Sequence, residues 1–217
     1  MAVSDRSNSR GIVQSMSELS RATVSRLPRY LRLLEDAEGI RETVSSEALA
    51  KAAGANAANV RRDLSDLGFQ GTRGVGYSVS DLRERIRREL RIEERRLVAI
   101  IGAGNIGTAL GRYQGLSRNG FDVVAIYDNA PSRVGNTVGS IEIQHLSDMP
   151  DDCEGGCFDM AILAVPADAA QEVTDILVEK GIRSILNFAP QRINVPDEVA
   201  VHQVDLSTEL QILSYYG

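Results

Sequence analysis

The clearest pattern of apolar and polar positions lies in residues 97–128. An apolar run over 97–101 leads into a glycine-rich turn, a helix-length segment follows, and a second apolar run over 123–127 ends at Asp128. Short apolar runs that alternate with helical segments are typical of parallel strands joined by crossover helices. The pattern therefore predicts a strand–helix–strand unit in this part of the chain.

The same alternation continues towards the end of the chain, where a helix is predicted over 167–180. Further strands are predicted over 141–143, 160–165, 184–187 and 199–204. Strands that alternate with helices form a doubly wound parallel sheet of the α/β class. Residues 97–204 are therefore predicted to be one Rossmann-type domain.

Helical spacing dominates the first third of the chain. Apolar residues recur every three or four positions over 22–38, and Pro28 inside this pattern indicates either a helix that begins near it or one that is kinked there. A second helix is predicted over 46–54 with Ser46 as its N-cap, and a third is predicted to start at Asn56 or Ala57 and to run to about Leu67. Two helices joined by a short glycine-containing turn have the spacing of a helix-turn-helix motif.

The third predicted helix has one apolar and one polar face. Val60, Leu64 and Leu67 share the apolar face, and the opposite face carries small, polar and basic groups that suit a DNA major groove. Residues 69–79 alternate glycine with short apolar runs, which predicts a hairpin, or wing, with Arg73 near its tip. The alternative is a small helical interaction domain that binds no nucleic acid.

The distribution of charge favours the first of these interpretations. Residues 1–96 carry a net charge of +4 and residues 97–217 carry −10, which together give the −6 of the whole chain. A basic third in an acidic protein indicates contact with a polyanion, although the arginines of a predicted linker helix over 81–96 can also form a solvated, salt-bridged face. The candidate DNA-binding residues are Asn59, Arg61, Arg62, Ser65 and Arg73.

The turn after the first strand reads Gly102-Ala103-Gly104-Asn105-Ile106-Gly107, the spacing of a dinucleotide-binding turn. Gly102 allows a tight turn, Gly104 lets a pyrophosphate approach the backbone, and Gly107 lets the helix pack closely on the sheet. Asp128 is expected to accept hydrogen bonds from an adenosine ribose and to repel a 2′-phosphate, which favours NAD(H) over NADP(H). The alternative is a glycine-rich turn that binds nothing.

Further cofactor ligands are expected where other strands end. Val165 and Pro166 follow one predicted strand, and Asn187 and Phe188 end another, so all four are expected beside a nicotinamide ring. Phe188 would prefer the uncharged dihydronicotinamide to the cationic NAD+ ring, unless it is simply a core aromatic residue. Arg133 is expected near the adenine, where it either stacks on the base or remains a solvated surface residue.

The cysteines and histidines indicate little further chemistry. Cys153 and Cys157 are too few for a disulfide framework, which fits a reducing cytosol, and their spacing does not form a zinc site, so no metal is predicted. Neither His145 nor His202 is expected at a strand end beside a lysine or a carboxylate. A proton donor for hydride transfer is therefore not identified, and no catalytic residue is assigned. The remaining alternative is an NAD-dependent oxidoreductase with an N-terminal appendage.

The two ends of the chain are predicted to lie outside both domains. Residues 1–19 are polar and lack the apolar core of a secretory signal, so they are expected to be a disordered leader. The sequence has no apolar run of about 18 residues, so no membrane span is predicted. Residues 205–217 place Leu206, Leu210 and Leu213 on one stripe of a helix, which must be buried against a partner subunit or against its own domain.

Six motifs are distributed along the chain from Ser20 to Tyr216. They are Arg26-Leu27-Pro28-Arg29-Tyr30, Val60-Arg61-Arg62-Asp63-Leu64-Ser65, Gly71-Thr72-Arg73-Gly74-Val75-Gly76-Tyr77, the turn over 102–107, Asn187-Phe188-Ala189-Pro190, and an ending that opens with Val204-Asp205-Leu206. Together they resemble the Rex family of bacterial redox-sensing transcriptional repressors. The first three motifs, placed directly before a Rossmann turn, make the resemblance specific.

This resemblance implies a winged-helix domain over 20–80 that recognises an inverted-repeat operator and a Rossmann domain that binds NADH or NAD+. It also implies a cytoplasmic homodimer in which the helix over 205–217 crosses to the partner subunit, and from which NADH releases DNA. By position, Arg32, Tyr113 and Asp205 would form a polar link between the two domains and the partner.

The sequence departs from the usual family pattern at Asp66 and Leu67. A carboxylate beside a phosphate is repelled. We therefore expect Asp66 to contribute nothing to operator affinity.

Overall fold

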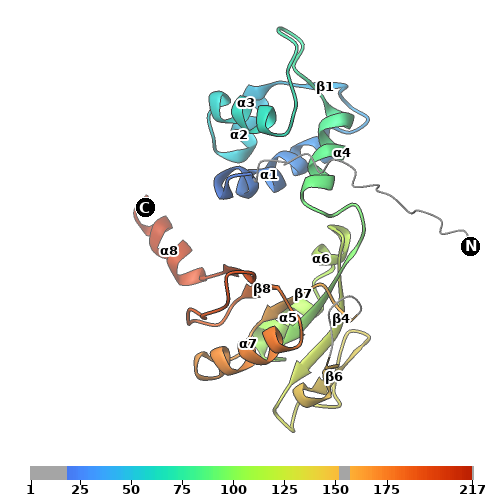
Figure 1. The fold of residues 1–217 in the computed structure, drawn as a ribbon, viewed down its shortest axis with the longest axis vertical. Coiled ribbons are helices and arrows are strands. Elements are labelled where there is room, and N and C mark those ends of the chain that lie inside the picture. Colours follow the sequence, from blue (N-terminus) through green and yellow to red (C-terminus); the bar gives the residue numbers. More distant parts are fainter. Residues whose placement is uncertain (1–18, 152–156, 217) are drawn as a thin grey trace, which may run out of the picture. The chain divides into compact units, whose positions relative to one another are not determined.

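The computed structural model describes residues 19–151 and 157–216 of the 217-residue chain (Figure 1). The chain divides into two compact units, Met1–Glu93 and Glu94–Gly217. The predicted leader, apart from Leu19, lies outside the described residues, and so does Cys153. No helix in the described parts of the chain has the length and the apolar character needed to cross a membrane.

The first unit combines a helix-turn-helix with a wing. Its elements are α1 (Arg21–Ala37), β1 (Thr43–Val44), α2 (Ser46–Ala53), α3 (Ala57–Asp66), β2 (Tyr77–Ser78) and α4 (Val79–Glu89). β1 pairs with β2 in the antiparallel sense, and a bridge between Thr72 and Gly76 closes the turn that precedes β2. The predicted winged helix-turn-helix is confirmed.

The ends of the helices in this unit follow from capping chemistry. The side chain of Ser45 accepts a hydrogen bond from the N–H group of Ala48 at 3.2 Å, so Ser45 is the N-cap of α2. The prediction of Ser46 was wrong by one residue, and Ser46 is instead a buried residue of the first turn. Gly54 ends α2 in the left-handed region, and the side chain of Asn56 caps α3.

α1 continues through Pro28 and begins seven residues before it, at Arg21. Pro28 lies on the exposed side of the helix, where water can solvate the carbonyl group that receives no hydrogen bond because proline lacks an N–H group. The opposite side buries Leu27, Tyr30 and Leu34 completely. These side chains form the centre of the core that α1 shares with the other helices of the unit.

The basic helix expected over 81–96 corresponds to α4, which begins earlier, at Val79, ends at Glu89 and packs within the first unit. Val79, Leu82 and Ile86 are buried in the core of that unit. Its arginines form ion pairs with glutamates in and around α1 and α4. Arg87 pairs with Glu35 of α1, and Arg83 pairs with Glu38, the residue after α1. Arg85 pairs with Glu89 of α4, and Arg88 pairs with Glu84 of α4 and with Glu93. The arginine-rich helix therefore has a salt-bridged face.

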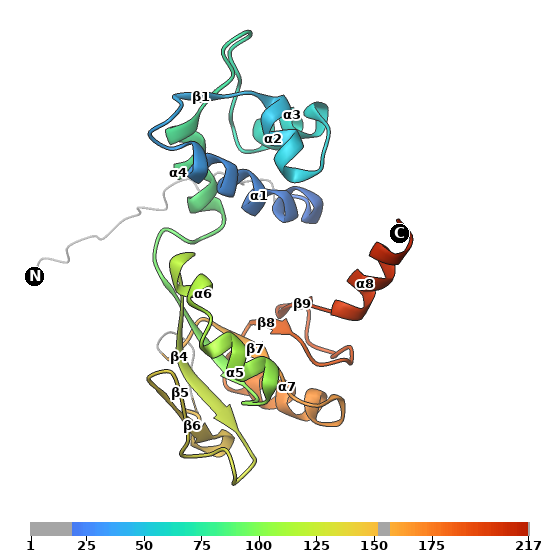
Figure 2. The same cartoon turned by 180° about the vertical axis from the view of Figure 1, so that it is seen from behind.

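The second unit is a sheet with helices on both sides (Figure 2). Its strands are β3 (Arg96–Ile101), β4 (Phe121–Asp128), β5 (Thr137–Val138), β6 (Ile141–His145), β7 (Met160–Leu163), β8 (Ser184–Asn187) and β9 (Ala200–Gln203). Its helices are α5 (Asn105–Gly111), α6 (Gln114–Arg118), α7 (Ala170–Glu179) and α8 (Leu206–Ser214), with short 3₁₀ turns at Leu146–Asp148 and Ala167–Ala169. The helix expected after the glycine turn is thus interrupted between Gly111 and Gln114.

The strand order identifies the fold. It is β5-β6-β4-β3-β7-β8-β9, and every pair is parallel except β5 with β6. From β6 onwards this is the order of a dinucleotide-binding sheet, in which the direction of winding reverses between β3 and β7. The predicted doubly wound fold is confirmed.

Alternating side chains of the sheet form two cores. Val98 and Ile100 of β3 belong to the cluster under α5 and α6, whereas Ala99 and Ile101 belong to the cluster under α7. A strand that is apolar on both faces must be covered on both sides. The two-sided burial explains why β3 is a continuous apolar run in the sequence.

Candidate functional site

A cavity of about 410 Å³ opens where β3, β4 and β7 end. In sheets of this topology, ligands bind beyond the carboxyl ends of the strands, at the point where the winding reverses. The residues that line the cavity are Ile101, Gly102, Gly104, Asn105, Ile106, Tyr127, Asp128, Asn129, Arg133, Leu146, Ala164, Val165, Pro166, Ala169 and Val173.

The three glycines of the turn have different steric surroundings. Gly102 has a φ of +100°, and a Cβ atom there would lie 2.5 Å from the carbonyl oxygen of Ala164. A Cβ atom on Gly107 would overlap the carbonyl oxygen of Gly102. A Cβ atom on Gly104, by contrast, would have no neighbour within 4 Å. The protein backbone requires glycine at two of these positions, whereas Gly104 leaves open space at the cavity wall.

The start of α5 lies at this open position. Gly104 is the N-cap and offers no side chain to the helix, and Asn105 and Ile106 are exposed residues that line the cavity. The first N–H groups of a helix have no acceptor within the helix and carry partial positive charge. The space beside Gly104 is therefore suited to a negatively charged group.

Asp128 connects the glycine turn to the end of β4. Its carboxylate accepts hydrogen bonds from the N–H groups of Ala103 and Ala130, both at 2.7 Å, and from Nη1 of Arg133 at 3.1 Å. Burial alone would raise the pKa of Asp128, but these hydrogen bonds lower the pKa below its ordinary value. A carboxylate can accept about four hydrogen bonds, so this anion retains capacity for a ligand hydroxyl.

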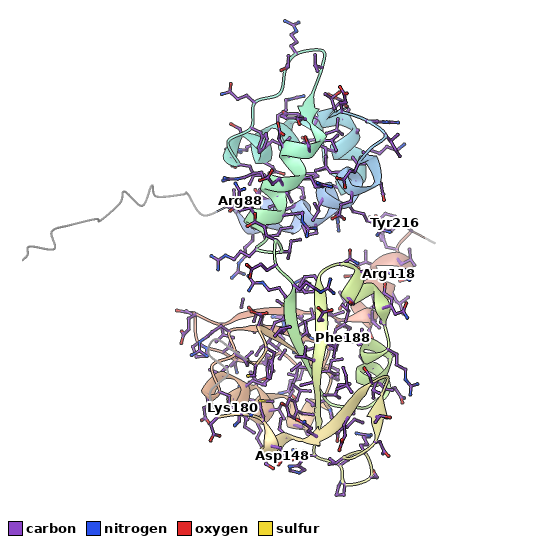
Figure 3. All side chains as sticks on the ribbon, turned by 90° about the vertical axis from the view of Figure 1, so that its right-hand side faces the viewer. Arg88, Arg118, Asp148, Lys180, Phe188 and Tyr216 are labelled. Carbon is purple, nitrogen blue, oxygen red and sulfur yellow. The ribbon has the colours of Figure 1, made fainter. Side chains whose placement is uncertain are left out.

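The structure brings eight of the twelve predicted cofactor ligands together at the cavity, and the other four do not line it. Val165 and Pro166 line the cavity, as do the predicted residues of the glycine turn other than Ala103 and Gly107. Asn187 and Phe188 do not line it. Phe188, labelled in Figure 3, is half-buried and packs against the cluster on the α5 side of the sheet. Its contact with a nicotinamide ring stays a prediction.

The apolar wall of the cavity was missed by sequence reasoning. Tyr127, Leu146, Ala169 and Val173 border the cavity and also belong to, or pack against, the core under α7. Their apolar character is that of ordinary core residues, so the pattern alone does not distinguish them. Tyr127 and Leu146 lie next to strand ends, which was the only available signal for these two residues.

His145 lies at a strand end, where its ring contacts a serine hydroxyl group. It is the last residue of β6, and its Nδ1 atom lies 2.7 Å from the hydroxyl oxygen of Ser147. It does not line the cavity.

Cys157 is half-buried against the core under α7, and it is not a free thiol.

The predicted DNA-binding side chains are all exposed, but they differ in their partners. Arg61 donates through Nη1 to the hydroxyl group of Ser46 at 3.2 Å and lies 3.7 Å from a carboxylate oxygen of Glu47. Arg62 and Arg73 form no ion pair with any residue that the structure describes. These two guanidinium groups are therefore available to a phosphate or a base.

A buried carboxylate next to this exposed face of α3 attaches that helix to α1. Asp63 is 2 % exposed and accepts two hydrogen bonds from Arg26, each at 2.7 Å. It also accepts from the hydroxyl groups of Tyr30 at 2.7 Å and Thr23 at 3.1 Å. Burial would raise the pKa of Asp63, but the hydrogen bonds from Arg26 and Tyr30 lower the pKa below its ordinary value. Sequence analysis did not identify this network.

Replacing Asp63 with asparagine is expected to lower the free energy of unfolding by about 3 kcal/mol, because Arg26 loses its buried counter-charge. Urea unfolding followed by far-UV circular dichroism measures the change. The matched control is Asp66→Asn on the exposed side of the same helix, which should change stability by less than about 0.5 kcal/mol.

The effect of Asp63→Asn should depend on pH in a defined direction. The pKa of Asp63 is lower in the folded state than the ordinary value of 3.8. Its stabilising contribution is therefore fully present above about pH 4 and is lost as the pH falls through the folded-state pKa. The difference between the two proteins should shrink in strong acid, and a constant difference would contradict this role.

The three residues expected to form a polar link lie on separate elements. Arg32 is an exposed residue of α1 in the first unit. Tyr113 lies at the interruption between α5 and α6, and 62 % of it is exposed. Asp205 caps α8, where hydrogen bonds from Thr208 and from the N–H group of Ser207 lower its pKa. The link among them stays a prediction.

The apolar stripe of α8 is exposed. Leu206, Leu210 and Leu213 are each more than 60 % exposed, and none of the described residues of α8 is buried. Such a stripe is costly in water because it leaves apolar surface unburied. The structure thus gives no support to the alternative that this helix packs onto its own domain.

Two protein-family models match this chain. A model described as a putative DNA-binding protein N-terminus matches residues 18–65, and a model described as a CoA binding domain matches residues 93–191. Redox-sensing transcriptional repressor Rex of Streptomyces avermitilis is 48 % identical over 90 % of this chain and 78 % of its own length. The repressor of the same name from Listeria welshimeri is 41 % identical over 94 % of this chain and 96 % of its own length.

The chain belongs to the Rex family of redox-sensing transcriptional repressors. Solved structures agree: RSP, a Rex-family repressor, is 34 % identical over 92 % of this chain. The match to RSP in complex with β-NAD+ and operator DNA covers 93 % of the RSP chain and has a TM-score of 0.83. The match to RSP in complex with β-NADH covers 94 % of the RSP chain and has a TM-score of 0.80. The Rex relatives are repressors and not enzymes, so the choice of a regulator over an oxidoreductase is confirmed.

Proposed function

We propose that this chain is a DNA-binding repressor whose second unit binds NADH or NAD+ and whose release from an operator is triggered by NADH. The observation that carries this proposal is the open space beside Gly104, between the start of α5 and the carboxylate of Asp128. The same chain carries a winged helix with a basic exposed face on α3. A nucleotide site and a DNA-binding unit in one chain favour a regulator that responds to the coenzyme over an enzyme that uses it.

The first unit would read an inverted-repeat operator through α3. In this fold, the second helix of the helix-turn-helix enters the major groove, and a wing reaches the adjacent backbone or minor groove. Asn59, Arg62 and Ser65 are exposed on α3, and Arg73 is exposed in the wing. Arg61, which is held by Ser46 and Glu47, would contribute from the edge of this face.

The cavity in the second unit would hold the dinucleotide along the carboxyl edge of the sheet. The pyrophosphate would lie beside Gly104, and the adenosine ribose would donate to Asp128, with Arg133 next to the adenine. The nicotinamide would lie towards Val165 and Pro166. RSP, 34 % identical to this chain, has been solved with β-NADH and, separately, with β-NAD+ and operator DNA, which supports the same pair of ligands here.

The exposed α8 supports a homodimer. A second copy of the chain would cover the stripe of Leu206, Leu210 and Leu213, and a two-fold dimer would match the symmetry of an inverted repeat. Arg32, Tyr113 and Asp205 would connect the two units and the partner. We propose the cytoplasm as the location, since the operator is there.

The decisive experiment titrates NADH and NAD+ separately into a complex of the protein with an inverted-repeat operator, followed by fluorescence anisotropy. NADH should release the DNA, whereas NAD+ should compete with NADH without releasing it. Thermodynamic linkage requires the operator to weaken NADH binding by the same factor, about 5- to 150-fold. Equal operator affinity with either form of the coenzyme would refute the proposal.

Replacing Asp128 with asparagine is expected to reduce the preference for NADH over NADPH by about 10-fold or more. The variant loses the charge that repels a 2′-phosphate, and a hydrogen bond to a charged group contributes about 1.5–3 kcal/mol. Titrations of both coenzymes, followed by their fluorescence, give the ratio of the two dissociation constants. An unchanged ratio would remove Asp128 from the site.

A further inference from the structure

We propose that Asn187 and Gln203 form a positioning pair that connects the wall of the cofactor cavity to the start of α8. The inference rests on the proposed function, because it assigns the route by which an occupied cavity alters the dimer helix. Neither side chain would touch the coenzyme. Their role would be to fix the backbone that joins β8, β9 and α8.

Asn187 has little hydrogen-bonding capacity left for a ligand. Its side chain is fully buried, and Nδ2 donates to the carbonyl oxygen of Gln191 at 2.9 Å and to Oε1 of Gln203 at 2.7 Å. Oδ1 accepts from the N–H group of Ala189 at 2.8 Å. Both amide hydrogens and the oxygen are therefore used inside the protein. The amide holds the loop after β8 instead of facing the cavity.

Gln203 completes the connection from the other strand. While its Oε1 atom accepts from Asn187, its Nε2 atom donates to the carbonyl oxygen of Ala189 at 2.9 Å. Asn187 and Gln203 also face each other in the register of β8 and β9. The segment that begins at Phe188 is thus bound to β9 through two side-chain amides, and it cannot move without either moving β9 or breaking these bonds.

One end of this connection reaches the cavity wall. The N–H group of Phe188 donates to the carbonyl oxygen of Leu163 at 2.8 Å, and Leu163 pairs with Asn187 in the register of β7 and β8. The next residues after Leu163 are Ala164, Val165 and Pro166, which line the cavity. A ligand that displaces this wall would therefore act directly on the backbone that carries Asn187.

The other end reaches α8 within three residues. The N–H group of Val204 donates to the carbonyl oxygen of Asn187 at 2.8 Å. Asp205 follows and caps α8, accepting from the N–H group of Ser207 at 2.9 Å and from the hydroxyl group of Thr208 at 2.8 Å. Because capped helices and paired strands are stiff, a shift of β9 at Gln203 is passed to the first turn of α8.

Gln203→Met in the full-length protein tests the pair, because methionine keeps the volume of glutamine and removes both hydrogen bonds. Three quantities are measured: the dissociation constant for NADH, the operator affinity without coenzyme, and the operator affinity with saturating NADH. The first two should change by less than about 3-fold. The factor by which NADH weakens operator binding should fall by roughly 2- to 30-fold.

Gln171→Met is the matched control. Gln171 of α7 also holds the loop after β8, through hydrogen bonds with Asn194, but it has no bond to Asn187 or to β9. It should leave the NADH effect unchanged. An equal loss of the effect in both variants, or no loss in Gln203→Met while the wild type responds, would overturn the inference and leave the proposed function standing. A wild type that does not respond to NADH would overturn both.

A charge-pair rescue separates positioning from general loss of structure. Asn187→Asp places a buried carboxylate against the carbonyl oxygen of Gln191, and should reduce the NADH effect on operator binding. Adding Gln203→Lys supplies an ammonium group that can donate to that carboxylate and to Ala189, and should restore the effect. If the single variant does not fold, Gln203→Glu replaces it: this variant keeps the acceptor for Asn187, loses the donor to Ala189 and should also reduce the NADH effect on operator binding. Failure of the double variant to recover the effect while it binds NADH normally would contradict the pair.

Discussion

Gly104→Val is expected to abolish NADH binding and leave a folded repressor that no longer responds to the coenzyme. The backbone of Gly104 has φ −72° and ψ −165°, which a branched residue can adopt, and no protein atom lies within 4 Å of its missing Cβ. Three added carbon atoms would fill the space that the pyrophosphate needs. Since overpacking costs about 1–3 kcal/mol, overpacking alone should lower the affinity for NADH by about 5- to 150-fold.

Calorimetry with NADH measures the loss, and thermal unfolding confirms that the fold is kept. The matched comparison is Gly107→Ala, whose smaller side chain would overlap the carbonyl oxygen of Gly102 and should destabilise the second unit. The two variants should thus separate binding from folding within one turn. NADH affinity close to that of the wild type in Gly104→Val would refute the assignment of the pyrophosphate to this turn.

Arg62→Ala is expected to remove operator binding while NADH affinity stays unchanged. The side chain is exposed on α3 and has no ionic partner among the residues that the structure describes, so its loss costs the free protein little. An arginine contact to DNA contributes about 1–3 kcal/mol, and a symmetric dimer makes the contact twice. The operator affinity should therefore fall by at least about 30-fold.

Anisotropy with labelled operator, at one fixed salt concentration, measures this loss. Arg88→Ala is the matched control, because Arg88 (Figure 3) is an exposed arginine of the same unit that pairs with Glu84 and Glu93 and lies outside α3 and the wing. Its effect on operator affinity should be small. Joint loss of operator and NADH binding in Arg62→Ala would indicate misfolding, and full retention of operator affinity would exclude Arg62 from the interface.

Local patterns allowed most of the fold to be predicted from the sequence. Apolar runs that alternate with helical segments specify a two-sided parallel sheet. The glycines at 102, 104 and 107 specify the turn, because the backbone requires glycine at 102 and 107 and position 104 is left open. The apolar spacing of Val60 and Leu64 identified the buried face of α3 in the same way. These features depend on residues that are close together in the chain.

Contacts between distant residues could not be predicted in this way. Arg26 and Asp63 are 37 positions apart, and neither looks different from a surface charge until α1 and α3 are packed together. Asn187 was expected at the cofactor because it ends a strand, but the direction of its amide depends on Gln203 and on the loop after β8. Side-chain direction at the end of a strand is a tertiary property, and no local pattern encodes it.

The residues of α3 that hold the fold are different from those that are exposed to solvent, and this separation has a consequence for operator recognition. Asp63 and its partners are buried between α3 and α1, whereas the neighbouring side chains of Asn59, Arg62 and Ser65 are exposed and make no contribution to the core. Substitutions at the outer positions can accumulate over generations without loss of folded protein. Under the proposed function, such substitutions would change which promoters the protein recognises and leave its scaffold intact.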